Sequence, residues 1–183
     1  PAMRSALANI VLLSILLSYN PLVSARTAIS IASGHGTKQV QAYRINYQKE
    51  WGGNSTTPNG RRINGYWEWA FSHMYSKKNF IVKTNMQLNA VTLAAVLRVQ
   101  GKMLLPVFLD LGIGGAYLSK QEIATRNLGR NLLFEERLGV GVLLGARRQF
   151  EISYRVTHFS NAYLSQFNHG LNLHLLTIGY WFN

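Results

Sequence analysis

Beyond the first 25 residues, apolar side chains alternate with small or polar ones along segments of about ten residues. The stretch RLGVGVLLGA (137–146) is typical, because every second position carries leucine or valine and the positions between carry mainly glycine. Successive side chains of a β-strand point to opposite faces, so this pattern predicts strands with one greasy face and one small or polar face. Short segments of this period are the signature of a membrane β-barrel.

The pattern predicts eight strands in all. They lie at 27–35, 38–50, 63–75, 87–100, 103–118, 132–145, 148–160 and 172–182. Eight is the smallest usual number for an outer-membrane barrel, and an even number leaves both chain ends on the periplasmic side. The short turns at 101–102 and 146–147 then lie on that side, where the connection 52–62 is unusually long, and the connection 161–171 lies outside. No internal repeat or domain boundary interrupts residues 26–183, so we expect one all-β domain, an eight-stranded antiparallel transmembrane β-barrel.

Alternation alone does not decide which face of the strands is inside. A glycine-rich face suits the cramped interior of a narrow barrel, and the aromatic residues lie mainly near strand ends, as in an interfacial girdle. Both features favour a barrel whose greasy face meets lipid. A soluble lipid-binding barrel with the greasy face inside remains the alternative.

The N-terminal stretch is typical of an export signal. Arg4 is followed by an apolar run from Ala6 to Leu17 and then by Val23-Ser24-Ala25, a small-residue ending. The run is shorter than the roughly 20 residues that a transmembrane helix needs. We predict a signal peptide over 1–25, cleaved after Ala25, and an integral protein of the bacterial outer membrane; a buried N-terminal helix is the alternative.

Composition narrows the partners and the chemistry. The chain has no cysteine, which excludes thiol nucleophiles and cysteine zinc clusters. Its formal net charge of +12 indicates a polyanionic neighbour, and the export signal favours lipopolysaccharide over nucleic acid. Basic residues in or near the predicted external loops are Lys77, Lys78, Lys83, Lys120, Arg126 and Arg130. A generally basic, solvated surface would use the same residues.

The strongest candidate site spans the end of the seventh predicted strand and the connection after it, in THFSNAYLSQFNHGLN (157–172). Strand alternation puts His158, Ser160 and Asn172 on the greasy, lipid-facing side, where polar groups are costly unless they have a function. A histidine can take the proton of a serine hydroxyl and make it a nucleophile. Asn161, Asn168 and the loop amides are available to stabilise an oxyanion. On their own, however, a surface histidine and serine and two turn asparagines are also compatible with an ordinary hairpin.

Taken together, these segments resemble a known family. ISYRVTHFSNAYLSQFNHGLN, with GYWEWAF, LLPVFLDLGIGGAYLS and LGRNLLFEERLGVGVLLGA upstream, is similar to the PagL-type lipid A 3-O-deacylases over about residues 38–182. The resemblance implies an outer-membrane barrel that hydrolyses the ester-linked acyl chain at the 3-position of lipid A without a metal or other cofactor. It also implies His158 as general base, Ser160 as nucleophile and Asn168 as an oxyanion-hole side chain.

Two positions depart from the family pattern. Asn172 stands where the family has a glutamate that orients the histidine, and an amide cannot stabilise the imidazolium by charge. Tyr163 stands where the family usually has a glycine that offers its backbone amide. The alternative function is therefore a catalytically inactive barrel with a structural or lipid-anchoring role. In either case lipopolysaccharide in the outer leaflet is the expected partner, and a homodimer is one assembly compatible with the sequence.

Overall fold

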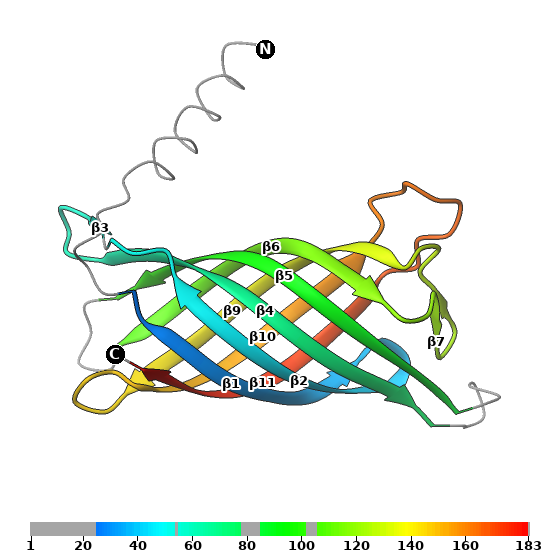
Figure 1. Ribbon diagram of the computed structural model, residues 1–183, viewed down its shortest axis with the longest axis horizontal. Coiled ribbons are helices and arrows are strands. Elements are labelled where there is room, and N and C mark those ends of the chain that lie inside the picture. Colours follow the sequence, from blue (N-terminus) through cyan, green and yellow to red (C-terminus); the bar gives the residue numbers. More distant parts are fainter. Residues whose placement is uncertain (1–24, 54, 78–84, 102–105, 183) are drawn as a thin grey trace, which may run out of the picture.

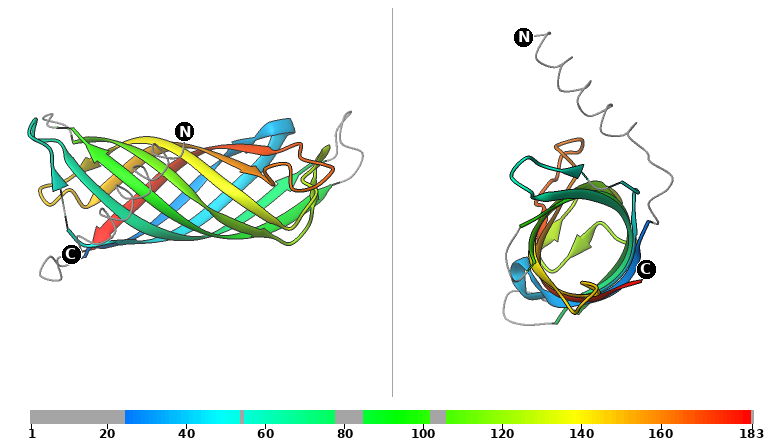
Figure 2. Two further views of the ribbon diagram at one scale, coloured as in Figure 1. Left: turned by 90° about the horizontal axis from the view of Figure 1, so that it is seen from above. Right: turned by 90° about the vertical axis from the view of Figure 1, so that its left-hand side faces the viewer.

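The chain forms a closed, up-and-down β-barrel in the computed structural model, which describes residues 25–53, 55–77, 85–101 and 106–182 (Figures 1 and 2). Eight long strands build the wall: β1 (Thr27–Gly36), β2 (Val40–Glu50), β4 (Arg62–Ser76), β5 (Met86–Gln100), β6 (Val107–Leu118), β9 (Leu132–Leu144), β10 (Phe150–Ser160) and β11 (Leu171–Phe182). Each of these strands pairs antiparallel with the long strands that precede and follow it in the chain. The first, β1, pairs with the last, β11, and this closes the barrel. The predicted fold and strand number are confirmed.

The strand limits differ from the predicted ones where the backbone turns. The second strand begins at Val40 and not at 38, because Lys38 and Gln39 have φ near +60° and lie in a single 3₁₀ turn, η1 (Thr37–Gln39). The seventh begins at Phe150 and not at 148, because Arg148 also has a positive φ. The first residues of the predicted strand 103–118 lie outside the described part of the chain. The long connection 52–62 contains the short β3 (Ser55–Thr56), which pairs with the start of β4.

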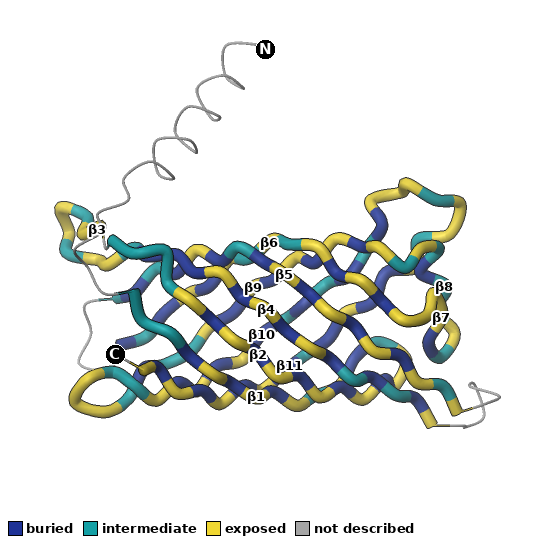
Figure 3. Tube along the Cα trace, viewed as in Figure 1, coloured by how far each residue is buried: buried dark blue, intermediate teal, exposed yellow. Residues whose placement is uncertain are grey.

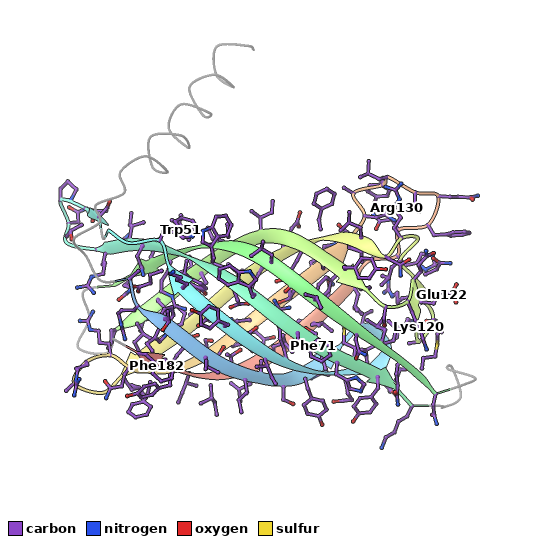
Figure 4. The ribbon with its side chains drawn as sticks, in the orientation of Figure 1. Trp51, Phe71, Lys120, Glu122, Arg130 and Phe182 are labelled. Carbon is purple, nitrogen blue, oxygen red and sulfur yellow. The ribbon has the colours of Figure 1, made fainter. Side chains whose placement is uncertain are left out.

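Burial alternates along most of the length of the eight long strands, as Figure 3 shows. The exposed positions are mainly apolar, and aromatic side chains such as Phe71 and Phe182 project from the outside of the wall (Figure 4). The interior combines two apolar clusters with a dense set of paired charges. It holds four buried arginines and four buried carboxylates, which are Arg44, Arg98, Arg137, Arg155, Glu68, Asp110, Glu135 and Glu151. A soluble barrel with the greasy face inside is therefore the wrong alternative.

The buried charges form a connected network across the lumen. Glu68 accepts hydrogen bonds from Arg44, Arg137 and Arg155, and Arg155 in turn pairs with Glu151 at 2.7 Å. Buried ions are tolerated only when they are paired in this way. The described interior charges balance, four against four, so these buried groups together carry no net charge.

The two ends of the barrel differ. Both ends of the described chain lie at one end (Figure 1), and the connections 119–131 and 161–170 lie at the other. In the view along the axis, the hairpin of β7 (Glu122–Ile123) and β8 (Arg126–Asn127) lies inside the ring of the wall (Figure 2). Ile123 and Leu128 are fully buried there in an apolar cluster, so this hairpin caps the mouth of the barrel.

The predicted signal peptide over 1–25 lies outside the described residues except for Ala25, and it stays a prediction. Within the described ranges, no helix is long and apolar enough to span a membrane.

Candidate active site

Strands β10 and β11 bring His158, Ser160 and Asn172 to one patch of the outer wall. His158 and Asn172 are direct cross-strand partners, and Ser160 follows His158 by two residues on the same face. Side chains directly opposite in an antiparallel pair have Cβ atoms about 4.5–5.5 Å apart, so the register alone holds His158 and Asn172 in contact. His158 and Ser160 are partly exposed and Asn172 is exposed, whereas the alternate residues Thr157 and Phe159 point inward and are buried.

A short hydrogen bond links the first pair. His158 Nδ1 lies 2.5 Å from Asn172 Oδ1. The amide oxygen can only accept, so in this arrangement Nδ1 carries the proton and its N–H donates a hydrogen bond to Asn172 Oδ1. The neutral imidazole then has its lone pair on Nε2, which is the form that can take a proton from a hydroxyl group.

Ser160 is not yet engaged with that nitrogen. In the part of the chain that the structure describes, no hydrogen bond joins Ser160 Oγ to His158, and no other group bonds the Ser160 hydroxyl. Such contacts are often long before a substrate binds and tighten afterwards.

Gly170, which immediately precedes β11, lies against the imidazole ring of His158 and leaves space for it. It has φ +60°, and a Cβ placed on it would lie 2.9 Å from His158 Cε1 and 3.5 Å from Nε2. A side chain at this position would therefore push the ring out of place. The left-handed backbone and the close approach both require glycine here.

The connection 161–170 is built around its two asparagines. Asn161 is buried, and its side-chain amide donates to the carbonyl oxygens of Leu128 and Phe167, at 2.8 and 2.6 Å. The first bond ties the connection to the segment that directly follows the capping hairpin, and the second joins two parts of the connection itself. The Asn161 backbone N–H donates to Asn168 Oδ1 at 3.0 Å. This bond fixes the Asn168 amide so that its NH₂ group remains without a partner among the described residues.

Tyr163 lies in the same connection with φ +61°, and its side chain is 87 % exposed. The left-handed region is uncommon for a residue with a side chain. The backbone at this position therefore has the conformation that glycine adopts easily, while the tyrosine ring points away from the barrel into the surroundings. Sequence reasoning identified the unusual residue but not that the backbone keeps the glycine-like conformation.

The predicted basic residues cluster at this end where the structure describes them. Lys77, Lys120 and Arg130 are exposed, and Figure 4 places Lys120 and Arg130 beside the external connections. Arg126 instead donates to the carbonyl oxygen of His169 and ties the connection 161–170 to β8. Lys78 and Lys83 lie outside the described residues.

An apolar groove of about 430 Å³ runs along the outer wall beside His158. Leu111, Ile113, Leu138 and Val156 form its walls, and Glu136 lines it with the histidine. Sequence reasoning missed Glu136, although the alternation that placed Leu138 and Val140 outside also places Glu136 there. A larger groove of about 630 Å³ lies elsewhere on the wall, over β1, β2, β4 and β11, and Ser160 and His158 are not part of it.

No set of three or more His, Asp or Glu side chains within the described ranges is arranged to hold a metal ion. The groups that are present, a serine hydroxyl, an oriented imidazole and an amide donor, are those of acyl transfer.

Comparisons with known proteins agree with this chemistry. The family model described as lipid A 3-O-deacylase (PagL) matches residues 41–181. The lipid A deacylase PagL of Pseudomonas aeruginosa is 28% identical over 156 residues, which cover 85% of this chain and 87% of that protein. The protein of the same name from Bordetella bronchiseptica is 33% identical over 75 residues, 41% of each chain.

A solved structure has the same fold. The crystal structure of the outer membrane enzyme PagL superimposes with a TM-score of 0.73 and 24% sequence identity, over 84% of this chain and 98% of that one. The matched region of the family model includes every strand from β4 to β10 and all the site residues above. The chain therefore belongs to the PagL family of lipid A 3-O-deacylases.

Proposed function

We propose that this protein is an outer-membrane serine esterase that removes the ester-linked 3-O-acyl chain of lipid A. The observation that carries the proposal is the His158–Asn172 hydrogen bond on the lipid-facing wall. It leaves Nε2 free as a base two residues from Ser160, in a chain that belongs to a family of lipid A deacylases. The amphipathic substrate lies in the outer leaflet and reaches this face laterally.

In the first half of the reaction, His158 Nε2 takes the proton of the Ser160 hydroxyl as Oγ attacks the ester carbonyl carbon. A bond forms between Oγ and that carbon, and the carbonyl oxygen becomes an oxyanion. The free NH₂ group of Asn168 and the backbone N–H of Tyr163 are the donors that we assign to the oxyanion. The bond between the carbonyl carbon and the sugar oxygen then breaks, and the imidazolium returns its proton to that oxygen.

In the second half, water replaces the sugar. His158 takes a proton from the water as its oxygen attacks the acyl-Ser160 carbonyl carbon, and the bond to Oγ breaks. The products are a free fatty acid and lipid A with a hydroxyl at the 3-position, and the serine recovers its proton. Asn172 keeps Nδ1 protonated throughout, so Nε2 is always the nitrogen that exchanges protons.

The surroundings fit a lipid with an anionic head. The apolar groove beside His158 offers a place for an acyl chain on the outside of the barrel. Lys77, Lys120 and Arg130 at the same end are placed to attract the phosphates of lipid A. Asn161 acts through the connection, by holding the Asn168 amide in place.

The second candidate is a catalytically inactive barrel that anchors or organises lipid without hydrolysis. Asn172 is the observation that favours it, because a neutral amide supplies no charge to the imidazolium. The two candidates differ in one measurable property, the release of fatty acid.

The test is mass spectrometry of purified lipid A incubated with the detergent-extracted protein. We expect loss of one 3-O-acyl chain, abolished by Ser160→Ala and by His158→Ala. Ser33→Ala removes another hydroxyl from the outer wall, on β1, and should keep full activity. Heat-modifiable migration on a gel checks that each variant is folded. An unchanged lipid A mass with folded wild-type protein would leave the inactive barrel as the correct reading. The homodimer stays a prediction, which chemical crosslinking in micelles tests.

A further inference from the structure

All seven acidic residues of this chain lie in its described part, and six of them accept hydrogen bonds from other side chains. Four are buried in the lumen and paired with arginine. Glu50, near the end of the barrel that carries the chain termini, accepts from Asn64 at 3.0 Å, and Glu122 in the capping hairpin accepts from Asn127 at 2.9 Å. The seventh, Glu136, is exposed on the outer face of β9. It is thus the one carboxylate of the chain that projects from the outer face of a wall strand.

Glu136 is the direct cross-strand partner of His158. In the register of β9 with β10, His158 lies opposite Glu136, and in the register of β10 with β11 it lies opposite Asn172. The imidazole is therefore flanked by an amide on one side and by a carboxylate on the other. Glu136 and His158 also line the same groove.

The position is costly for a charge. Its outward neighbours Ile113, Phe134 and Leu138 are apolar and exposed to the same surroundings. Among the described residues, none donates a hydrogen bond to Glu136 or forms an ion pair with it. An isolated carboxylate on a lipid-facing wall is unfavourable, and such residues are retained where they serve a function.

We propose that Glu136 is a positioning residue that stabilises the His158 imidazolium while Ser160 attacks, and so supplies the negative charge that Asn172 lacks. A single orienting carboxylate both fixes the tautomer of the histidine and stabilises the imidazolium by its charge, and in this chain two residues would share these roles. Asn172 fixes the tautomer through Nδ1, and Glu136 acts on the ring through its charge, across one strand spacing. The inference rests on the proposed esterase function.

The environment makes this interaction effective. Cross-strand partners have Cβ atoms about 4.5–5.5 Å apart, and the groove that both residues line is mainly apolar. A unit charge held roughly 6 Å from the imidazolium at an effective dielectric constant of about 20 changes a rate by on the order of 10- to 100-fold. The charge appears on His158 only during reaction, so the effect should fall on kcat and not on KM.

Five proteins test the proposal by lipid A deacylation kinetics: wild type, Glu136→Gln, Glu136→Asp, Asn172→Glu, and Asn172→Glu combined with Glu136→Gln. Glutamine keeps the size and polarity of Glu136 and removes only its charge. We expect Glu136→Gln to lower kcat about 10- to 100-fold with little change in KM, and Glu136→Asp to retain most of the activity. In the Glu136→Gln protein, Asn172→Glu should restore kcat to near the wild-type value. In the wild-type background the same change should give a smaller gain, because a carboxylate is already present. Glu50→Gln, at the opposite end of the barrel, is the matched control and should be unchanged.

The outcomes separate the possible failures. Wild-type protein without activity overturns the proposed function itself. Active wild type with an unchanged kcat in Glu136→Gln overturns the inference alone. An effect confined to KM would mean that Glu136 acts on the anionic substrate and not on His158. If Asn172→Glu raises kcat by the same factor in both backgrounds, the two positions are independent, and the proposal is wrong.

Discussion

Replacing Gly170 by alanine should disable the site while leaving the barrel intact. The new Cβ would lie 2.9 Å from His158 Cε1, whereas carbon atoms in favourable contact are about 3.5–4.0 Å apart. The ring must therefore withdraw by about 0.6–1 Å if the backbone holds. That movement displaces Nε2 and disturbs the 2.5 Å bond from Nδ1 to Asn172.

The expected loss of kcat is on the order of 10- to 100-fold, because a misplacement of about 1 Å can cost that much in a positioned reaction. The stability cost should be smaller. Alanine at φ +60° is strained by roughly 1–2 kcal/mol, and the connection 161–170 can absorb part of this. Activity should thus fall much further than stability.

Lipid A deacylation in mixed micelles measures kcat, and the temperature of heat-modified migration measures the fold. Gly115→Ala on β6 is the matched control, since a Cβ there would meet no atom within 4 Å. Full activity of folded Gly170→Ala would refute the reasoning, because it would mean that the imidazole does not need its present position. Equal losses in both variants would point to a general effect of the substitution.

Three further changes test other parts of the argument. Glu68→Gln should destabilise the barrel by about 3–5 kcal/mol in denaturant unfolding, since it leaves three arginines without their shared carboxylate, while Glu122→Gln in the exposed hairpin should not. Asn168→Ala should lower kcat about 100- to 1000-fold with a similar KM if its NH₂ group holds the oxyanion, and an unaffected kcat would remove it from that role. Tyr163→Gly should raise the free energy of local unfolding of the connection by about 1 kcal/mol, because glycine adopts the positive φ of this position without strain. Proteolysis in the connection should then be slower, and faster proteolysis would contradict this.

The wall of the barrel was predictable because apolar side chains recur at every second position of its strands. One face of each strand meets lipid and the other packs in a narrow lumen, so the two sets of side chains differ sharply in polarity. This contrast also predicts from the sequence alone that His158, Ser160 and Asn172 share one outer patch. Strand ends were less predictable, because Lys38 and Arg148 take positive φ values that their residue types do not announce.

The connection 161–170 could not be predicted in the same way. Asn161 and Asn168 looked equivalent in the sequence, yet one is buried and bonded to Leu128 and Phe167 while the other presents a free amide. The difference depends on the capping hairpin, which lies more than 30 residues earlier in the chain. Contacts between segments so far apart in the chain produce no periodic pattern in the sequence. Glu136, by contrast, was predictable from alternation alone, because it breaks the apolar face that Leu138 and Val140 continue.

The interior network explains why a site of this kind lies on the outside of the barrel. Eight paired charges occupy the lumen, which makes it an unfavourable environment for an acyl chain. The backbone register of the wall places Glu136, His158 and Asn172 side by side on three successive strands. In the reaction that we propose, the lipid substrate approaches laterally through the membrane, and its ester is cleaved where the apolar groove meets the polar patch. Specificity for the head group must then come from the external connections and not from the barrel. Exchanging the connection 119–131, which carries Lys120 and Arg130, should therefore alter which lipid is bound, whereas substitutions at Glu136 or Asn172 should alter only how fast it reacts.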